Sequence, residues 1–163
     1  MKKILAAAVA MGLVGLTHAA TATSNLNVSA TVAAACTFAS TSTTLTFPTF
    51  NPTVAAVTAS ADIDITCNNG LSYDVELDLG ANALGSTRRM TDGSGFLEYT
   101  LTRPSATNTN TGLNWGTGTN KITRTGTGAS DPARAFGTIP FSVANQAATT
   151  GTYSDTVVIT ITY

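Results

Sequence analysis

The side chains that could do chemistry in this sequence are mainly carboxylates at alternating positions. Asp74, Glu76 and Asp78 share one face of an expected strand, and so do Asp62 and Asp64. Such a row could bind Ca²⁺, and a converging pair of acids could hydrolyse a glycoside. The same spacing is typical of the solvated face of a strand, where charge discourages pairing with other chains. We favour the solvated face and therefore predict no catalytic residue, no metal ligand and no cofactor.

The sequence has few residues for histidine or thiol chemistry. The only histidine is His18, so without the first 22 residues neither a histidine triad nor the common zinc sites are available. Cys36 and Cys67 form an even pair, which in an exported chain predicts a disulfide. Closing that loop of about 31 residues would stabilise the fold by roughly 3–4 kcal/mol. A lipid anchor on Cys36 is the alternative, but the cysteine lies far beyond the apolar run and lacks the usual preceding leucine.

Trp115 and the paired arginines were the other candidates for a binding site. An exposed tryptophan in a loop can stack on a sugar, whereas a buried one fills the space between two sheets, and we favour the buried position. Arg88 and Arg89 form a cluster too small to bind an extended anion, so we expect a solvated loop. Glycine-rich stretches at 93–95, 116–118 and 126–128 lead into no expected helix, so we expect turns rather than phosphate loops.

Export is indicated by the first 22 residues. Lys2 and Lys3 precede an apolar run over 4–16, and small residues follow it, which is the layout of a secretory signal peptide. The run is shorter than the roughly 20 residues that span a bilayer. Cleavage after Ala19 fits the small residues, cleavage after Ala22 fits them slightly better, and both sites remain open. A buried N-terminal helix is the alternative.

Composition bounds the class of protein. Removing residues 1–22 leaves six basic and nine acidic side chains, a net charge of about −3, which disfavours nucleic acid as a partner. Charged residues make up 10% of the chain, well below the level of ordinary soluble domains, and Thr, Ser, Asn and Gly supply most of the polarity. The remaining length suits one domain with its own core.

Strict alternation of apolar and polar residues predicts an all-β fold. Alternating segments occur at 25–32, 61–67, 73–79, 97–103 and 157–163. The turn at 68–70 could close a hairpin or carry the chain from one sheet to another. Short strands are expected near 113–115 and 121–124, within the poorly patterned stretch 105–130. Many short strands separated by polar turns favour a β-sandwich.

Both ends of the mature chain carry an alternating strand. The apolar face of the first consists of Leu26, Val28, Ala30 and Val32, and that of the last consists of Val157, Ile159, Ile161 and Tyr163. An apolar strand at an exposed edge promotes aggregation unless something covers it. From periodicity alone, 25–32 would be the first strand of its own domain.

Several stretches, in order, resemble the spore coat protein U family, and within it the major pilin of archaic chaperone–usher (Csu-type) pili. They are 26–32 with 36–38, 65–70, 114–116, 136–140 and the final run Gly151, Thr152, Tyr153, Ser154, Asp155, Thr156, Val157 with its alternating strand. The resemblance covers the mature chain. Family members often carry Tyr-Gly-Arg-Ile where this chain has Phe136, Gly137, Thr138 and Ile139, and we expect that difference to affect a contact between subunits rather than the fold.

The resemblance implies an incomplete immunoglobulin-like β-sandwich over residues 36–163 that lacks its last strand. A segment at 23–35 would donate Leu26, Val28, Ala30 and Val32 to the groove of a neighbouring copy, a groove bordered by the C-terminal strand. The implied partners are copies of the same chain in a head-to-tail fibre, a periplasmic chaperone, an outer-membrane usher and minor or tip pilins. The implied location is a pilus on the cell surface, with roles in adhesion and biofilm formation.

Two other functions remain open at this point. A secreted carbohydrate-binding sandwich would be a soluble monomer with Trp115 near its sugar face. A carboxylate hydrolase would need a pocket in which two acids converge, which the alternation does not support.

Overall fold

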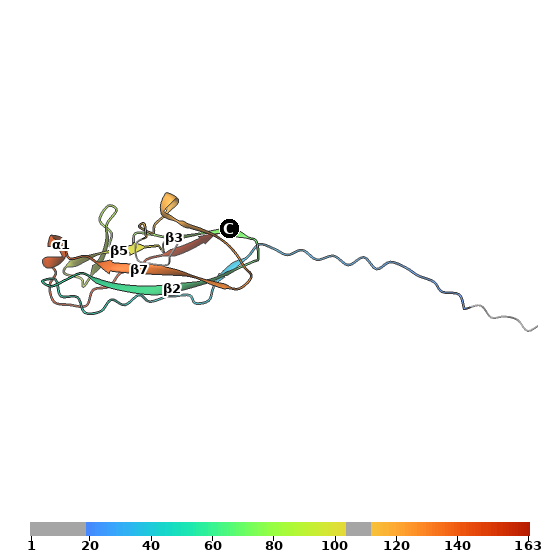
Figure 1. Cartoon of the computed structure of the whole chain (residues 1–163), viewed down its shortest axis with the longest axis horizontal. Coiled ribbons are helices and arrows are strands. Elements are labelled where there is room, and N and C mark those ends of the chain that lie inside the picture. Colours follow the sequence, from blue (N-terminus) through green and yellow to red (C-terminus); the bar gives the residue numbers. More distant parts are fainter. Residues whose placement is uncertain (1–18, 104–111) are drawn as a thin grey trace, which may run out of the picture. The chain divides into compact units, whose positions relative to one another are not determined.

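The computed structural model describes residues 19–103 and 112–163, and the chain divides into the units Met1–Val32 and Ala33–Tyr163. In the first unit, residues 19–32 are extended and belong to no strand (Figure 1). The expected signal peptide falls largely on residues 1–18, outside the described chain. No helix among the described residues is both long and apolar enough to cross a bilayer.

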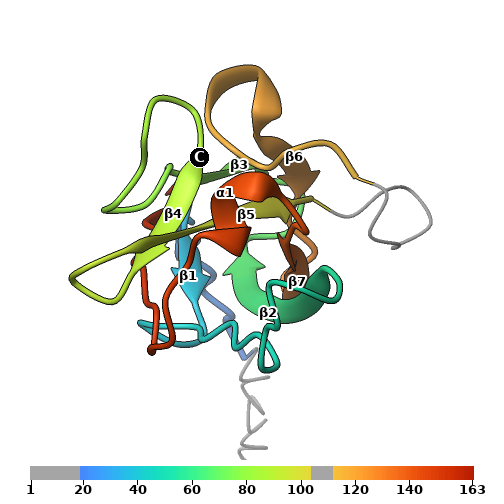
Figure 2. The same cartoon turned by 90° about the vertical axis from the view of Figure 1, so that its left-hand side faces the viewer.

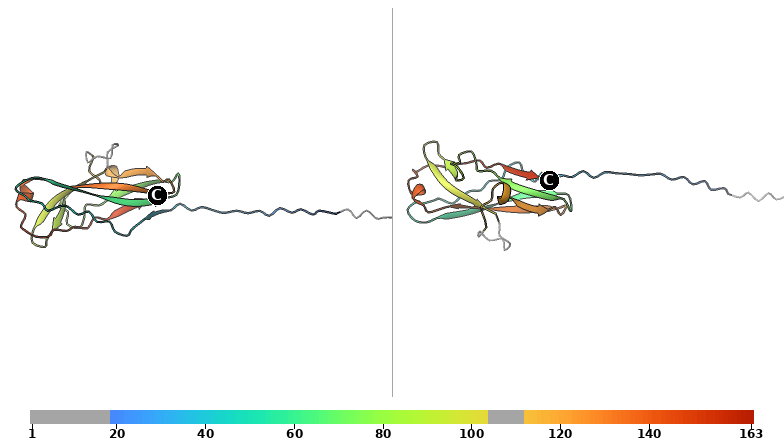
Figure 3. Two further views of the ribbon diagram at one scale, coloured as in Figure 1. Left: turned by 60° about the horizontal axis from the view of Figure 1, so that its bottom comes forward. Right: turned by 90° about the horizontal axis from the view of Figure 1, so that it is seen from above.

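The second unit is an all-β sandwich of two sheets. The larger sheet has the order β1-β2-β7-β5-β4, formed by Cys36–Phe38, Val57–Cys67, Ser130–Ile139, Phe96–Thr102 and Arg88–Thr91. The smaller sheet has the order β6-β3-β8, formed by Ile122–Thr125, Ser72–Leu77 and Ile159–Thr162. Strands in both layers run along the length of the domain (Figure 3). The expected all-β class is confirmed.

Alternation explains most of these strands. In β2, Ile63, Ile65 and Cys67 are buried, while Asp62 and Asp64 face outward. In β3 and β5 the buried positions are Tyr73, Val75, Leu77, Leu97, Tyr99 and Leu101. Every strand pair is antiparallel, and the longest is β2 with β7, in register from Val57 opposite Ile139 to Thr66 opposite Ser130. The core lies between the two sheets.

The turn after β2 is an arch between the sheets and not a hairpin. β2 belongs to the larger sheet and β3 to the smaller one, and Leu71 N donates to Asn68 O at 3.1 Å to close the turn. Gly70 has a φ of +80°, a left-handed conformation that glycine adopts without steric cost. Of the two alternatives left open by the sequence, the structure has the arch.

Two short helices complete the described chain. The 3₁₀ turn η1 spans Gly118–Asn120 and the single α-turn α1 spans Val143–Gln146. Asn145 of α1 is wholly buried. Its side-chain oxygen accepts from Glu98 N at 2.7 Å, and its side-chain Nδ2 donates to Glu98 O at 3.0 Å. These bonds fix α1 against β5 at the end of the domain opposite the C-terminus (Figures 1 and 2).

Candidate functional site

The C-terminal strand β8 has a hydrogen-bonded partner along only one edge in the described part of the chain. β3 lies on that edge, with Leu77 opposite Ile159 and Val75 opposite Ile161. Asp78 N donates to Val158 O at 3.0 Å, directly opposite it in the same register. Because bonded and non-bonded pairs alternate along an antiparallel ladder, Ile159 and Ile161 direct their backbone N–H and C=O away from β3. An edge with these groups exposed is a template for another strand.

The side chain of Ile159 also lines an open groove of about 1160 Å³ between the sheets. Its floor includes inward-facing residues of both layers, among them Ile63, Leu77, Leu97, Leu101, Ala135 and Ile139. Val157 and Ile159 line one side and are only half-buried. An apolar side chain from another segment could therefore be buried there, beside backbone groups that are ready to pair.

Residues 40–50 also line the groove. Leu45, Phe47 and Phe50 pack against the core but remain half-buried, and the alternating threonines between them are exposed. The Phe47 ring meets Tyr99 edge-on with 6.4 Å between centroids. It also lies on Gly137 of β7, where an added Cβ would come within 2.6 Å of the ring. Glycine at this position makes room for the aromatic side chain.

The structure places the predicted donor residues in full exposure. Leu26, Val28 and Val32 are 87%, 85% and 83% exposed, and Ala30 is exposed as well. No strand forms over 25–32, so the strand predicted there is absent from this chain's own fold. Three large aliphatic side chains on one face of an extended segment are thus left almost fully exposed.

Of the four C-terminal residues predicted to border the groove, three pack against the core and one does not. Val157, Ile159 and Ile161 pack against the core from the open edge, whereas Tyr163 is 57% exposed beyond the end of β8. Their role as the border of an acceptor groove stays a prediction.

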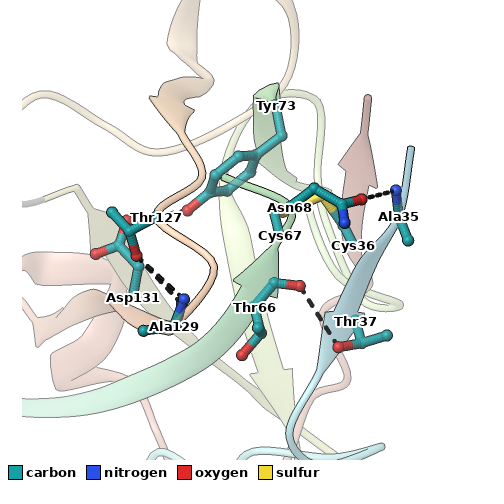
Figure 4. Close-up of a disulfide and its surroundings, with 10 residues drawn as sticks. All are labelled: Ala35, Cys36, Thr37, Thr66, Cys67, Asn68, Tyr73, Thr127, Ala129 and Asp131. Carbon is teal, nitrogen blue, oxygen red and sulfur yellow. Dashed lines mark hydrogen bonds between the residues drawn. A yellow bond between two sulfur atoms is a disulfide. The ribbon is translucent and has the colours of Figure 1, made fainter. Parts of the chain in front are cut away.

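Cys36 and Cys67 form a disulfide that joins β1 to the last residue of β2 (Figure 4). Asn68, which follows β2, accepts from Ala35 N through its side chain at 2.5 Å and donates from its own N to Ala35 O at 3.1 Å. Thr37 Oγ1 donates to Thr66 O at 3.5 Å. The start of the domain is therefore attached covalently and by hydrogen bonds to the arch between the sheets.

Trp115 is wholly buried, as the core interpretation expected. Its indole N–H donates to Val75 O at 3.0 Å, which satisfies the one polar atom of the ring. A stacking face for a sugar is thus not exposed at this residue.

The expectation for the arginine pair was wrong. Arg88 is 6% exposed rather than solvated, and its guanidinium donates to the carbonyls of Asp78 (2.6 and 2.9 Å), Leu77 (3.3 Å) and Trp115 (2.7 Å). Burial lowers the pKa of Arg88, and the nearby Tyr99, Asp78 and Asp155 counteract it. Arg89 lies over the Phe96 ring at 3.9 Å. Sequence reasoning missed Arg88 because only the tertiary fold brings these carbonyls together.

One acid of each acidic row, Asp62 and Asp74, forms an ion pair on the outer face of its sheet. Arg134 holds Asp62 through two bonds of 2.7 Å, and its hydrogen bonds lower the pKa of that carboxyl. Lys121 bonds Asp74 at 2.7 Å, and this hydrogen bond likewise lowers the pKa of the Asp74 carboxyl. No cluster of acids, cysteines or histidines able to hold a metal ion occurs within 19–103 and 112–163.

The glycine-rich stretches lie in turns and loops. Gly93, Gly118 and Gly128 have positive φ, and within 19–103 and 112–163 the one helix that begins at any of them is the 3₁₀ turn η1, which starts at Gly118. Gly118 N donates to Glu76 Oε1 at 2.9 Å, so its N–H already has an internal acceptor. Of the two weak strands expected, 121–124 corresponds to β6, and 113–115 contains only a bridge between Asn114 and Thr102. Residues 104–111 of the poorly patterned stretch lie outside the described chain.

Comparison with known proteins adds the family. The model of the Spore Coat Protein U domain matches residues 22–160. Protein U of Myxococcus xanthus is 35% identical over 164 aligned positions, which cover 90% of this chain and 87% of that protein.

The fold also resembles a solved structure. The chain is similar to a chain of the CsuC–CsuE chaperone–tip adhesion subunit pre-assembly complex from the archaic chaperone–usher Csu pili of Acinetobacter baumannii. The TM-score is 0.56 at 21% identity, and the match covers 82% of this chain. It spans 41% of the matched chain, so the likeness concerns less than half of that chain.

Proposed function

The chain belongs to the Spore Coat Protein U family, and we propose that it is a structural subunit of a bacterial surface pilus that polymerises by donor-strand complementation. The observation that carries the proposal is the pairing of two complementary defects in one chain. One is an open apolar groove beside an unpaired strand edge, and the other is an extended segment with exposed aliphatic residues at every second position. Each supplies what the other lacks.

Within this proposal, residues 1–22 are the signal peptide, 23–35 the donor segment and 36–163 the incomplete immunoglobulin-like domain. The donor of one copy lies along β8 of the next, with Leu26, Val28, Ala30 and Val32 directed into the groove. Both strands repeat every two residues, so apolar side chains and outward backbone groups come into phase together. This is β-strand addition, in which backbone hydrogen bonds supply affinity and side-chain pockets supply register.

The energetics favour a stable but non-covalent joint. Burying a large aliphatic side chain contributes about 1.5–3 kcal/mol, and three are exposed in the donor segment. Each new backbone hydrogen bond adds about 1 kcal/mol net. The contact is head to tail, so it does not close into a ring and a fibre grows.

The proposal also assigns partners and location. Before assembly a periplasmic chaperone would occupy the groove, and an outer-membrane usher would exchange it for the next donor. Minor or tip pilins would complete the fibre at the cell surface, where it would support adhesion and biofilm formation. The proposal gives the chain no enzymatic role. The alternative of a carbohydrate-binding module loses its main support because Trp115 is buried.

The test is the assembly state of the mature protein on a denaturing gel, unheated and heated. We expect a ladder of multimers that heat dissociates, and we expect it to vanish when residues 23–33 are deleted or Val28 is changed to Asp. Ser29→Asp is the matched control, because it adds the same charge one residue along, on the opposite face of the segment. A wild-type protein that stays monomeric, or a ladder that survives Val28→Asp, would refute the mechanism.

A further inference from the structure

The run from Gly151 to Val158, in the last of the stretches that carry the family resemblance, changes sheets along its length. Ser154 exchanges two backbone bonds with Thr91 of β4, at 2.9 and 3.0 Å, in the larger sheet. Thr156 O then accepts from Ala81 N at 3.1 Å, and Val158 O accepts from Asp78 N at 3.0 Å, on the continuation of β3 in the smaller sheet. Asp155 is the residue between the two attachments.

The Asp155 carboxylate bonds to both layers. Oδ1 accepts from Ala81 N and from Asn82 Nδ2, each at 3.0 Å, on the chain that follows β3. Oδ2 accepts from the hydroxyl of Tyr99, a buried residue of β5, at 2.6 Å. Burial and the neighbouring carboxylate raise the pKa of Tyr99, so its hydroxyl stays protonated and donates. Bonds to an ionised acceptor are stronger than neutral ones.

The surrounding residues restrict where the Asp155 carboxylate can lie. Gly80 has a φ of +81°, and an added Cβ there would occupy the space of the Asp155 carboxylate. The buried guanidinium of Arg88 fixes the carbonyls of Leu77 and Asp78 at the end of β3, the strand that the chain joins after Asp155. Asp78 in turn accepts from Val158 N through its side chain at 2.9 Å. Arg88 thus holds the strand end independently of Asp155, and the Asp78 bond to Val158 is a second contact between that end and the joining chain.

We propose that Asp155 is the positioning residue of the acceptor strand: it fixes the register in which the chain joins β3 and thereby which residues of β8 face the groove. The inference rests on the proposed donor-strand function. A slip of one residue along β3 would turn Ile159 and Ile161 outward and bring Val158 and Thr160 into the groove, because side chains alternate between faces. The donor would then meet Val158 and Thr160 in place of the two isoleucines, a smaller and partly polar surface.

The test compares amide hydrogen exchange in the mature chain carrying Val28→Asp, which disables its own donor segment, with and without Asp155→Ala. Thr160 and Thr162 direct their N–H groups toward β3 by the alternation derived above. We expect their exchange to rise roughly tenfold or more when the three bonds to Asp155 are lost. Exchange in the β2–β7 ladder should not change. The affinity for a synthetic peptide of residues 23–33 should fall by a similar factor.

Asp62→Ala is the matched control, since it also removes charge-assisted bonds from a carboxylate but lies on the outer face of the larger sheet. It should leave Thr160, Thr162 and peptide affinity unchanged. Asp155→Asn keeps one oxygen acceptor and should give an intermediate result. Should Asp155→Ala not fold, Tyr99→Phe removes a single bond to the carboxylate and should raise exchange at the same amides by less.

Unchanged exchange at Thr160 and Thr162 overturns the inference, and so does an equal rise in the β2–β7 ladder, which would mean a general loss of stability. Failure of the peptide to bind when Asp155 is present refutes the proposed function instead. The exchange comparison needs no peptide and still decides the role of Asp155 in that case.

Discussion

The β2–β7 ladder and the β8 edge both contain alternating apolar strands, but they differ in how far those strands are paired and buried. Ile63 and Ile65 of β2 are buried, and β2 has partners on both sides, β1 and β7. Ile159 and Ile161 of β8 alternate in the same way but remain half-buried beside an edge that no described residue pairs. The difference lies in the partner and not in the strand. An alternating strand therefore encodes a face to be buried, while its neighbours determine whether the burial is completed within the chain.

The largest expected effect comes from a substitution in the core of the sandwich. Trp115→Ala should lower the free energy of unfolding by about 3–5 kcal/mol, because it empties the core and leaves Val75 O without its donor. The loss should be equal with and without the donor peptide, as Trp115 lies away from the open edge. Denaturant unfolding followed by circular dichroism measures it. A cost below about 1 kcal/mol would contradict the core assignment.

The next effect concerns the disulfide beside the ladder. Replacing Cys36 and Cys67 together by Ala should cost about 3–4 kcal/mol, because the reduced chain gains the freedom of the loop between them. The β8 edge contributes nothing to this loss. A reducing agent should lower the unfolding midpoint of the wild-type chain and leave that of the double variant unchanged. Equal sensitivity of both would contradict the assignment.

A matched pair of substitutions sharpens the comparison directly. Ile65→Val should cost about 0.5–1.5 kcal/mol whether or not donor peptide is present. Ile159→Val should cost less than Ile65→Val in the Val28→Asp monomer, where the side chain is half-exposed, and should approach it once the peptide fills the groove. Unfolding of both variants with and without peptide gives the four values. An Ile159→Val cost that the peptide does not change would mean that the groove is not its binding site.

The smallest effect is the acid sensitivity of the outer face of the ladder. Arg134 lowers the pKa of Asp62 below its ordinary 3.8, so the pair stabilises the fold above that value and ceases to do so as the pH falls through the lowered pKa. Both side chains are more than a third exposed, so the effect should be small. Asp62→Asn should flatten the stability curve between about pH 4 and pH 2. An unchanged acid limb would show that the pair does not contribute.

The alternation of apolar and polar residues predicted the strands whose buried faces consist of large side chains. β2, β3, β5 and β8 all fall where the pattern placed them, although β3 ends at Leu77 and leaves Leu79 exposed. The long strand β7 was missed, because its inward face consists of Ala133, Ala135, Gly137 and Ile139 and reads as weakly apolar. Those small residues are required by what lies on them, as Phe47 on Gly137 shows. Pro132 also obscured the strand, and it is tolerated because β5 pairs with β7 only from Phe136 to Thr138.

The candidate site was predictable to a similar degree. The two apolar alternating termini could be recognised from the sequence because period two is a local property. The buried Arg88 and the Asp155 carboxylate could not, since each acts through partners ten or more residues away that only the completed fold assembles. The consequence of Phe136 for contacts between subunits stays a prediction. Polar networks between layers are the part of this molecule that residue patterns do not reveal.

The disulfide has a mechanical consequence in a fibre of such subunits. Tension along the fibre would enter each domain through residues 33–35 and reach Cys36 first. From there the sulfur bridge would carry the load straight to the end of β2. The three-residue strand β1 would otherwise be peeled from its edge one bond at a time. Because the bridge bypasses β1, the pull would act along the length of the ten-pair β2–β7 ladder, which must shear all its bonds together to yield.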